Sequence, residues 1–191
     1  TSAVSSSCDG HRSLLACVMH AGGVLHDAIL CNQTASSVKS VAAPKTHGMA
    51  HLNMGMGAVP VQTVVTFSSV AALFGSPGQS NYSAANAALD ASIRHRHREG
   101  NVGTSVQWGA WGGGGMALQD RSTEARMERL GMGMLTVAQG MTVLTTMLRD
   151  TSQRSGMAQM AASPFVWTRV LERFETLSGL LQEFRTAPVE L

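Results

Sequence analysis

Apolar residues in this chain gather into short, nearly continuous runs instead of alternating with polar ones. Four such runs occupy residues 14–19, 61–67, 102–108 and 157–162. Continuous runs of this length are typical of strands that are covered on both faces, as in a parallel sheet. The segments between them are long enough for helices. The pattern therefore predicts an α/β fold, an open parallel sheet with helices on both faces.

The intervening segments carry helix signals of differing clarity. Pro44 interrupts the first helical segment and predicts a kink or a new helix start there. Ser80 and Asn81 can cap the best-defined helix, and Gly100 follows its end. The Gly- and Met-rich segment 49–57 is expected to be a loop. Helices are expected over residues 35–52, 81–98, 122–129, 137–148 and 164–179.

Charge is nearly balanced, with 14 Lys and Arg against 12 Asp and Glu. This balance does not favour nucleic acid as a partner. The basic run at residues 94–98 could bind an anionic partner, but a solvated helix end whose charge complements the helix dipole is the favoured interpretation. No apolar stretch approaches the ~18 residues of a membrane span, so no membrane partner is expected.

The chain contains three cysteines, Cys8, Cys17 and Cys31, and no CxxC motif. This pattern is neither a disulfide framework nor a zinc site, and it suits a reducing, cytoplasmic compartment. The seven histidines also show no ligand spacing, so no metal is expected.

Polar residues that could take part in catalysis cluster after the second apolar run. Ser68 and Ser69 end that run, at the strand edge where open α/β sheets bind ligands. Tyr82, the only tyrosine of the chain, and Asn86 are four residues apart, so they face the same side of the following helix. Tyr82 is a candidate proton donor, although the spacing alone fits an ordinary core residue as well.

Several motifs in the right order resemble the ketoreductase domain of polyketide and fatty-acid synthases, within the short-chain dehydrogenase/reductase superfamily. They are HAGGVLHDAIL, APKTHG, FSSVAALFGSPGQSNYSAANAALDA, VQWGAWGGGGMA, GMGMLTVAQGM and ASPFVWTRVL. The resemblance covers residues 14–174. It implies a Rossmann-like sheet and an enzyme that uses NADPH.

The resemblance also implies a catalytic set. Ser69, thirteen positions before the tyrosine, would be the active-site serine, Tyr82 the catalytic tyrosine and Asn86 its partner. The lysine of this family comes from the APK motif, here Lys45, which without the resemblance is better interpreted as an exposed helix lysine. A nearby ammonium would lower the pKa of the phenol, and Asn86 would hold the lysine or a water in a relay.

Cofactor and substrate contacts are implied in the same way. Lys45 and Tyr82 would also contact the cofactor. The HAGG turn would pass its adenosine side, and the WGxW segment would lie against the nicotinamide. These two segments contribute Ala21 and Gly22, and Gly109 and Trp111.

The motif VLHD resembles the LDD motif of ketoreductases that give the D-configured 3-hydroxy product. Asp27 and Asn81 would then lie near the substrate. Phe74 stands where the opposite class carries tryptophan, and His26 departs from the pattern.

No Gly-rich phosphate turn precedes the first apolar run, so the fold is expected to lack the first strands of a nucleotide-binding sheet. This would leave the strand at 14–19 with an unpaired edge. Residues 1–12 are expected to be disordered or a linker, 13–175 the C-terminal part of a ketoreductase domain, and 176–191 a helix or tail. The four-glycine loop from Gly112 would lead to a lid.

The sequence therefore predicts NADPH-dependent reduction of a β-ketoacyl thioester to the 3-hydroxyacyl form. The expected partners are an acyl carrier protein that holds the thioester and the other synthase domains of the parent chain. Two alternatives stay open. One is a structural ketoreductase-like subdomain without activity of its own, and the other is a short-chain epimerase or dehydratase.

Overall fold

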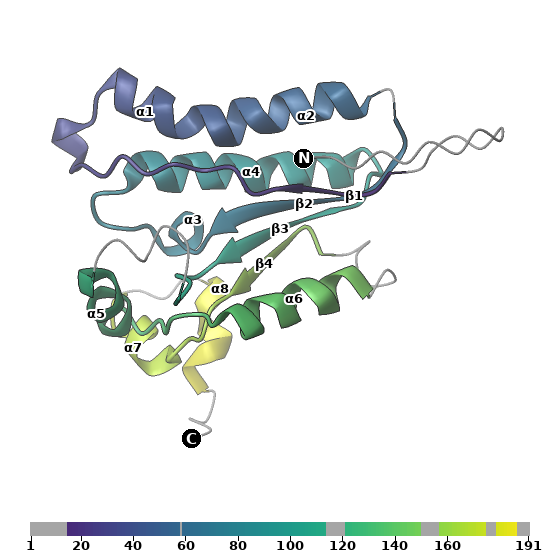
Figure 1. Cartoon of the computed structure of the whole chain (residues 1–191). Helices are drawn as coiled ribbons and strands as arrows, with labels where there is room; N and C mark the ends of the chain where they lie inside the picture. Colours follow the sequence, from purple (N-terminus) through teal and green to yellow (C-terminus); the bar gives the residue numbers. More distant parts are fainter. Residues whose placement is uncertain (1–14, 58, 114–120, 150–156, 175–178, 187–191) are drawn as a thin grey trace. The chain divides into compact units, whose positions relative to one another are not determined.

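The computed structural model describes residues 15–57, 59–113, 121–149, 157–174 and 179–186. The described residues group into two compact units (Figure 1). The first comprises those of Thr1–Gln107 and Thr151–Met160, and the second those of Trp108–Asp150 and Ala161–Leu191. The expected linker at 1–12 and most of the expected lid loop lie outside the described residues.

The four apolar runs form the four strands of one sheet, in the order β1-β2-β3-β4. Their arrows point the same way in Figure 1, and β1 and β2 pair in parallel, with Val18 opposite Val64. The predicted parallel α/β sheet is therefore confirmed. The strands are β1 (Leu15–His20), β2 (Val61–Ser69), β3 (Gly103–Trp108) and β4 (Gln159–Ala162).

Burial differs sharply between these strands. Every residue of β3 is buried, as a strand covered on both faces requires. In β1, by contrast, Leu15 and Met19 are more than 40% exposed. The prediction of cover on both faces was wrong for β1, because β1 is an edge strand that pairs only with β2 among the described residues.

The first helical segment is divided at Pro44, as predicted. Helix α1 (Ala35–Ala42) begins at a capping box in which Thr34 and Ser37 bond each other's backbone amides. A π-helical turn, η2 (Ala43–His47), then carries Pro44 at its start and leads into α2 (Gly48–Met56). The prediction of a loop at 49–57 is therefore wrong, because α2 covers most of this segment. Burial of Met49 in the core outweighs the poor helix propensity of the glycines.

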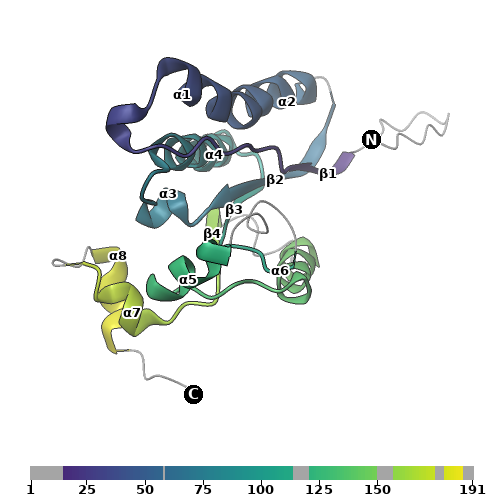
Figure 2. The same ribbon diagram turned by 60° about the vertical axis from the view of Figure 1, so that its left-hand side comes forward.

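Helices α1, α2 and α4 cover one face of the sheet in the first unit (Figures 1 and 2). The core of that unit joins Met49 of α2 and Val64 of β2 to Leu89 and Ile93 of α4, all at most 1% exposed. Helix α4 spans Ser80–Arg98 and is preceded by the short helix α3 (Ala71–Phe74).

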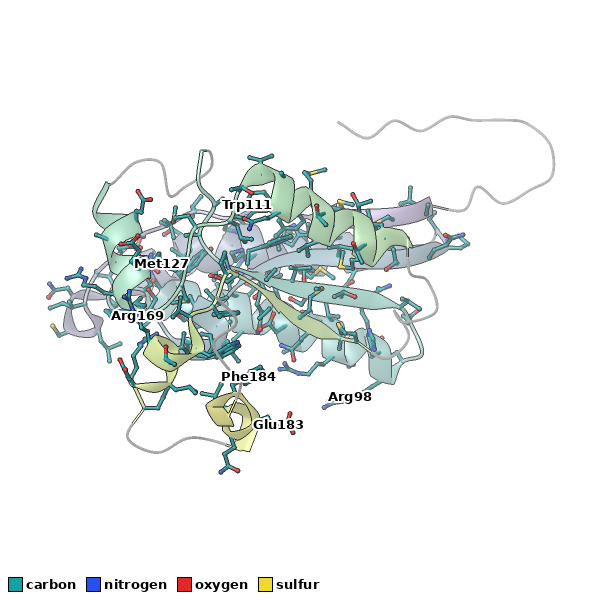
Figure 3. All side chains as sticks on the ribbon, turned by 90° about the horizontal axis from the view of Figure 1, so that it is seen from below. Arg98, Trp111, Met127, Arg169, Glu183 and Phe184 are labelled. Carbon is teal, nitrogen blue, oxygen red and sulfur yellow. The ribbon has the colours of Figure 1, made fainter. Side chains whose placement is uncertain are left out.

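The start of α4 differs from the expectation and its end agrees with it. Ser80 lies inside the helix, and Gln79 occupies the capping position without a side-chain cap bond. The side chain of Asn81 instead accepts the backbone N–H of Tyr82. At the other end Gly100 turns the chain with a positive φ of 77°, and Arg98 extends away from the ribbon in Figure 3.

The second unit contains the remaining helices. Helices α5 and α6 agree with the predicted ranges, whereas the helix expected at 164–179 is shorter. It is confined to α7, and α8 starts only at Gly179. The elements are α5 (Arg121–Arg129), α6 (Val137–Arg149), α7 (Trp167–Leu171), α8 (Gly179–Gln182) and the 3-10 turn η5 (Glu183–Thr186). None of the described helices is long and apolar enough to cross a lipid bilayer.

Candidate active site

Lys45 is buried, contrary to the exposed position that the residues alone suggested. The π-helical turn η2 directs its side chain inward, and only 3% of it is exposed. Its Nζ donates a hydrogen bond to the carbonyl of Phe67 near the end of β2, at 3.0 Å. The same Nζ lies 5.5 Å from the centre of the Tyr82 ring. Residues 37 positions apart in the sequence therefore meet at one point.

Tyr82 lies in the first turn of α4 with Ser69 and Asn86 against it. Hydrogen bonding to these two side chains lowers the pKa of the phenol, against the larger effect of burial. The Oγ of Ser69 also accepts the backbone N–H of Ala71, at 3.2 Å, which fixes the hydroxyl where β2 ends. The four residues predicted as catalytic are thus brought together around one phenol.

Asn86 is fully buried and held by α4 itself. Its Nδ2 donates to the backbone carbonyl of Tyr82 at 2.8 Å, and its backbone carbonyl accepts the hydroxyl of Ser68 at 3.3 Å. Asn86 was expected to hold Lys45 or a water, and the described bond of the ammonium goes to the carbonyl of Phe67 and not to Asn86. The amide oxygen of Asn86 is buried without a hydrogen-bond partner among the described residues, so a polar acceptor remains available beside the phenol.

The protonation of the pair differs from the expectation. Burial lowers the pKa of Lys45 to about 8, and the Asp90 carboxylate opposes this effect. Burial raises the pKa of Tyr82 above its ordinary value, although its hydrogen bonds to Asn86 and Ser69 lower it in part. The expected lowering of the pKa of the phenol was therefore wrong for the resting protein. In the resting protein near neutral pH the lysine is therefore charged and the phenol is neutral.

A buried polar network below the phenol was missed by sequence reasoning. Asp90 is 2% exposed, and its carboxylate accepts hydrogen bonds from Ser105 at 2.6 Å and Gln107 at 2.7 Å. The hydroxyl of Ser105 in turn accepts one from Thr66 of β2 at 2.9 Å. The signal was available, because Asp90 continues the four-residue spacing of Tyr82 and Asn86 along one helix face.

The two residues predicted to contact substrate brace a loop against the start of α4. The carboxylate of Asp27 accepts a hydrogen bond from Gln79 at 2.8 Å. The Nδ2 of Asn81 donates to the carbonyl of His26 at 2.9 Å. The loop that carries VLHD is thereby fixed next to Tyr82. Gln79, 6% exposed, is a further residue of this contact that the sequence did not single out.

Ala21 and Gly22 follow β1 and are exposed. They lie next to His20, whose ring Nε2 is 3.2 Å from the carbonyl oxygen of Lys45. A Cβ at Gly22 would lie 3.2 Å from both the His20 ring and the Pro44 carbonyl oxygen. The end of β1 is therefore close to the turn that carries Lys45.

Gly109 and Trp111 belong to the second unit. A Cβ on Gly109 would overlap the side chain of Ser163, so glycine is required there. The Trp111 ring, labelled in Figure 3, lies 5.0 Å from that of Trp108 and rests on Gly140 of α6. Both predicted cofactor contacts thus have packing roles within their own unit. In neither unit do the described residues form a cluster of His, Cys, Asp or Glu that could hold a metal ion.

A family model described as the KR domain matches residues 1–113, more than half of the chain. The chain belongs to the KR, or ketoreductase, domain family. Ketoreductase domains of polyketide synthases are oxidoreductases, and the predicted resemblance is confirmed at the level of the family.

Individual relatives agree with this assignment. The chain is 42% identical over 117 residues to the polyketide synthase GfsB of Streptomyces halstedii, which covers 61% of the chain and 2% of GfsB. An A1-type ketoreductase of solved structure is 32% identical with a TM-score of 0.78, covering 88% of the chain and 35% of that ketoreductase. The angucycline C-6 ketoreductase LanV, solved with bound NADP, is similar in fold at 16% identity and a TM-score of 0.64. The chain thus spans about a third of the length of the A1-type ketoreductase.

Proposed function

We propose that this ketoreductase chain reduces a β-ketoacyl thioester, presented on an acyl carrier protein, to its 3-hydroxyacyl form with NADPH as the hydride donor. The observation that carries the proposal is the convergence of Lys45, Ser69 and Asn86 on the phenol of Tyr82. A hydroxyl, a phenol and an ammonium at one point are the groups that the reduction of a carbonyl needs.

The donors present fit a nicotinamide cofactor. Lys45 carries three N–H donors, and the described contacts give it one acceptor, the carbonyl of Phe67. The other two donors can bind ribose hydroxyls, so Lys45 would bind the cofactor beside Tyr82. The exposed turn at Ala21 and Gly22 and the segment of Gly109 and Trp111 would provide further contacts with the cofactor. When bound, the cofactor would supply hydride to the carbonyl carbon.

The protein's own part is to move one proton. Ser69 donates a hydrogen bond to the substrate carbonyl oxygen. Tyr82 is neutral in the resting protein, which the raised pKa reinforces, and it donates its proton to that oxygen as negative charge develops. The phenolate left behind is stabilised by the Lys45 ammonium 5.5 Å from the ring. A buried ammonium is most useful at this step, since a low-dielectric site strengthens its field.

Two residues support a contact with the acyl substrate. Asp27 and Asn81 lie on the braced loop and on the first turn of α4, next to Tyr82. We infer that this loop orients the β-ketoacyl chain toward the D-configured 3-hydroxy product. Residues 13–175 would form the C-terminal part of the reductase domain of a longer polypeptide. The other synthase domains of that polypeptide would provide the carrier protein.

The decisive experiment follows NADPH oxidation with a β-ketoacyl thioester surrogate, on the chain alone and on an N-terminally extended form. The active form is expected to lose roughly 10²–10⁴-fold in kcat on Tyr82→Phe, the range of general acid catalysis. Ser69→Ala and Ser68→Ala are a matched pair, because the described bond of the Ser68 hydroxyl goes to the backbone carbonyl of Asn86. The larger loss should follow Ser69→Ala. Unchanged activity of the Tyr82→Phe protein would refute the assignment.

A binding measurement separates the enzyme from the structural alternative. Titration of NADPH against the same two forms should give saturable binding in the active form, weakened by Lys45→Met. Saturable binding to neither form would favour a subdomain without activity. A change at the substrate's stereocentre or loss of water without NADPH oxidation would instead indicate an epimerase or dehydratase.

A further inference from the structure

One pair of opposite charges is buried in the first unit. Among the described residues, one Lys or Arg side chain is buried, that of Lys45, which is 3% exposed. One Asp or Glu side chain is buried, that of Asp90, which is 2% exposed. A buried charge without compensation is strongly destabilising, so proteins pair such charges or neutralise them. The two residues share one unit: Asp90 lies on α4 itself, and Lys45 reaches Tyr82 of that helix from η2.

The carboxylate is fixed where its field reaches the ammonium. Tyr82, Asn86 and Asp90 follow each other at four-residue intervals, so their side chains lie along one face of α4. Ser105 and Gln107 of β3 donate to the two carboxylate oxygens and fix the group in position. Asp90 forms no direct ion pair with Lys45 in the described contacts, so it acts on the ammonium through space.

Among the described residues, Asp90 is the carboxylate that acts on Lys45, and the Asp27 carboxylate acts on Tyr82. On the elements around Lys45, β1 offers the ring of His20, β2 only hydroxyls and the carbonyl of Phe67, and α4 the phenol of Tyr82 and the carboxylate of Asp90. Lys39 and His47 are on the helical segment of Lys45 itself and cannot supply negative charge.

We propose that Asp90 is a positioning residue that keeps the Lys45 ammonium charged beside Tyr82, as the buried counter-charge of the site. This rests on the proposed function for its purpose, because a charged Lys45 matters when the phenol gives up its proton. The pairing itself is a property of the resting chain, and it is measurable without substrate or cofactor.

The test is an NMR titration of the chain labelled with ¹³C at the ε carbons of lysine. The chain has only two lysines, and the exposed Lys39 gives a reference signal that Lys39→Arg assigns. In Asp90→Asn the titration of Lys45 should move to lower pH by about one unit, the usual size of the effect of a nearby opposite charge. In Ser105→Ala, which removes one donor but keeps both charges, it should stay in place. An unmoved Lys45 signal in folded Asp90→Asn overturns the proposal.

Thermal unfolding provides a second readout. Asp90→Asn and Lys45→Met should each lower the Tm, and the double variant should be more stable than the sum of the two losses predicts, because it leaves no lone buried charge. If Asp90→Asn alone does not fold, recovery of folding in the double variant supports the pair, and its failure to recover counts against it. Neither readout uses reductase activity, so an inactive chain with a shifted Lys45 signal contradicts only the proposed function.

Discussion

The pKa of Lys45 makes a quantitative prediction about stability. Burial lowers this pKa from 10.5 in the unfolded chain to about 8 in the folded one. Between these values the unfolded state binds more protons than the folded state, so the free energy of unfolding rises with pH across this window. Below pH 8 the lysine is charged in both states, so the folded state carries the full free-energy cost of burying the charge.

The magnitude follows from the size of the shift. At about 1.4 kcal/mol per pKa unit, the lowered pKa costs the folded chain about 3 kcal/mol at pH 7. Raising the pH to 9.5 should restore roughly 2 kcal/mol of this, since Lys45 is then neutral in the folded state but still mostly charged in the unfolded state. Because the side chain is 3% exposed, solvent screens little of the effect.

The measurement is urea unfolding of the chain and of Lys45→Met at pH 7, 8, 9 and 9.5, followed by far-ultraviolet circular dichroism. The difference in unfolding free energy between the two proteins isolates the lysine from all other titrating groups. It should grow in favour of the unmodified chain as the pH rises. A difference that stays constant, or that changes in the opposite direction, would refute the argument that burial controls this lysine.

Three further substitutions test the packing. Leu89→Ala empties a fully buried position of the core and should cost about 3 kcal/mol in urea unfolding. Gly131 has a φ of 73°, and a Cβ there would lie 2.7 Å from a backbone nitrogen of α7. Gly131→Ala should therefore lower the Tm more than Gly100→Ala, where φ is 77° but the space is open, and an equal loss would contradict this. Gly140→Ala should displace the Trp111 ring that rests on it, seen as a shifted indole signal in the NMR spectrum; an unmoved signal would place the ring elsewhere.

The strands and the long helix α4 could be predicted because local pattern determines them. Continuous apolar runs mark buried strands, and Gly100 marks a helix end by its freedom to adopt positive φ. The exposure of Leu15 could not be predicted from the run that contains it. Burial depends on what covers a strand, and the same apolar run suits an edge strand and a central one equally.

The candidate site was predictable in part. The spacing of Tyr82 and Asn86 gives a shared helix face, and the family resemblance adds Ser69 and Lys45, which the structure brings to the same phenol. The pKa of the phenol was predicted with the wrong sign. Proximity of an ammonium argues for a lower value, but burial of the ring acts more strongly, and burial is not visible in the spacing of residues.

The burial of Lys45 was misjudged although its position follows helical spacing. The sequence predicts a kink or a new helix start at Pro44, and the residues alone suggested that Lys45 is exposed. The buried positions of the segment, Ser37, Val41, Lys45 and Met49, follow each other at four-residue intervals through the π-helical turn. Two of these four side chains are polar, so the apolar pattern does not reveal the buried face. Which face is buried depends on packing against His20 and β2, and that packing is not visible in the spacing of residues.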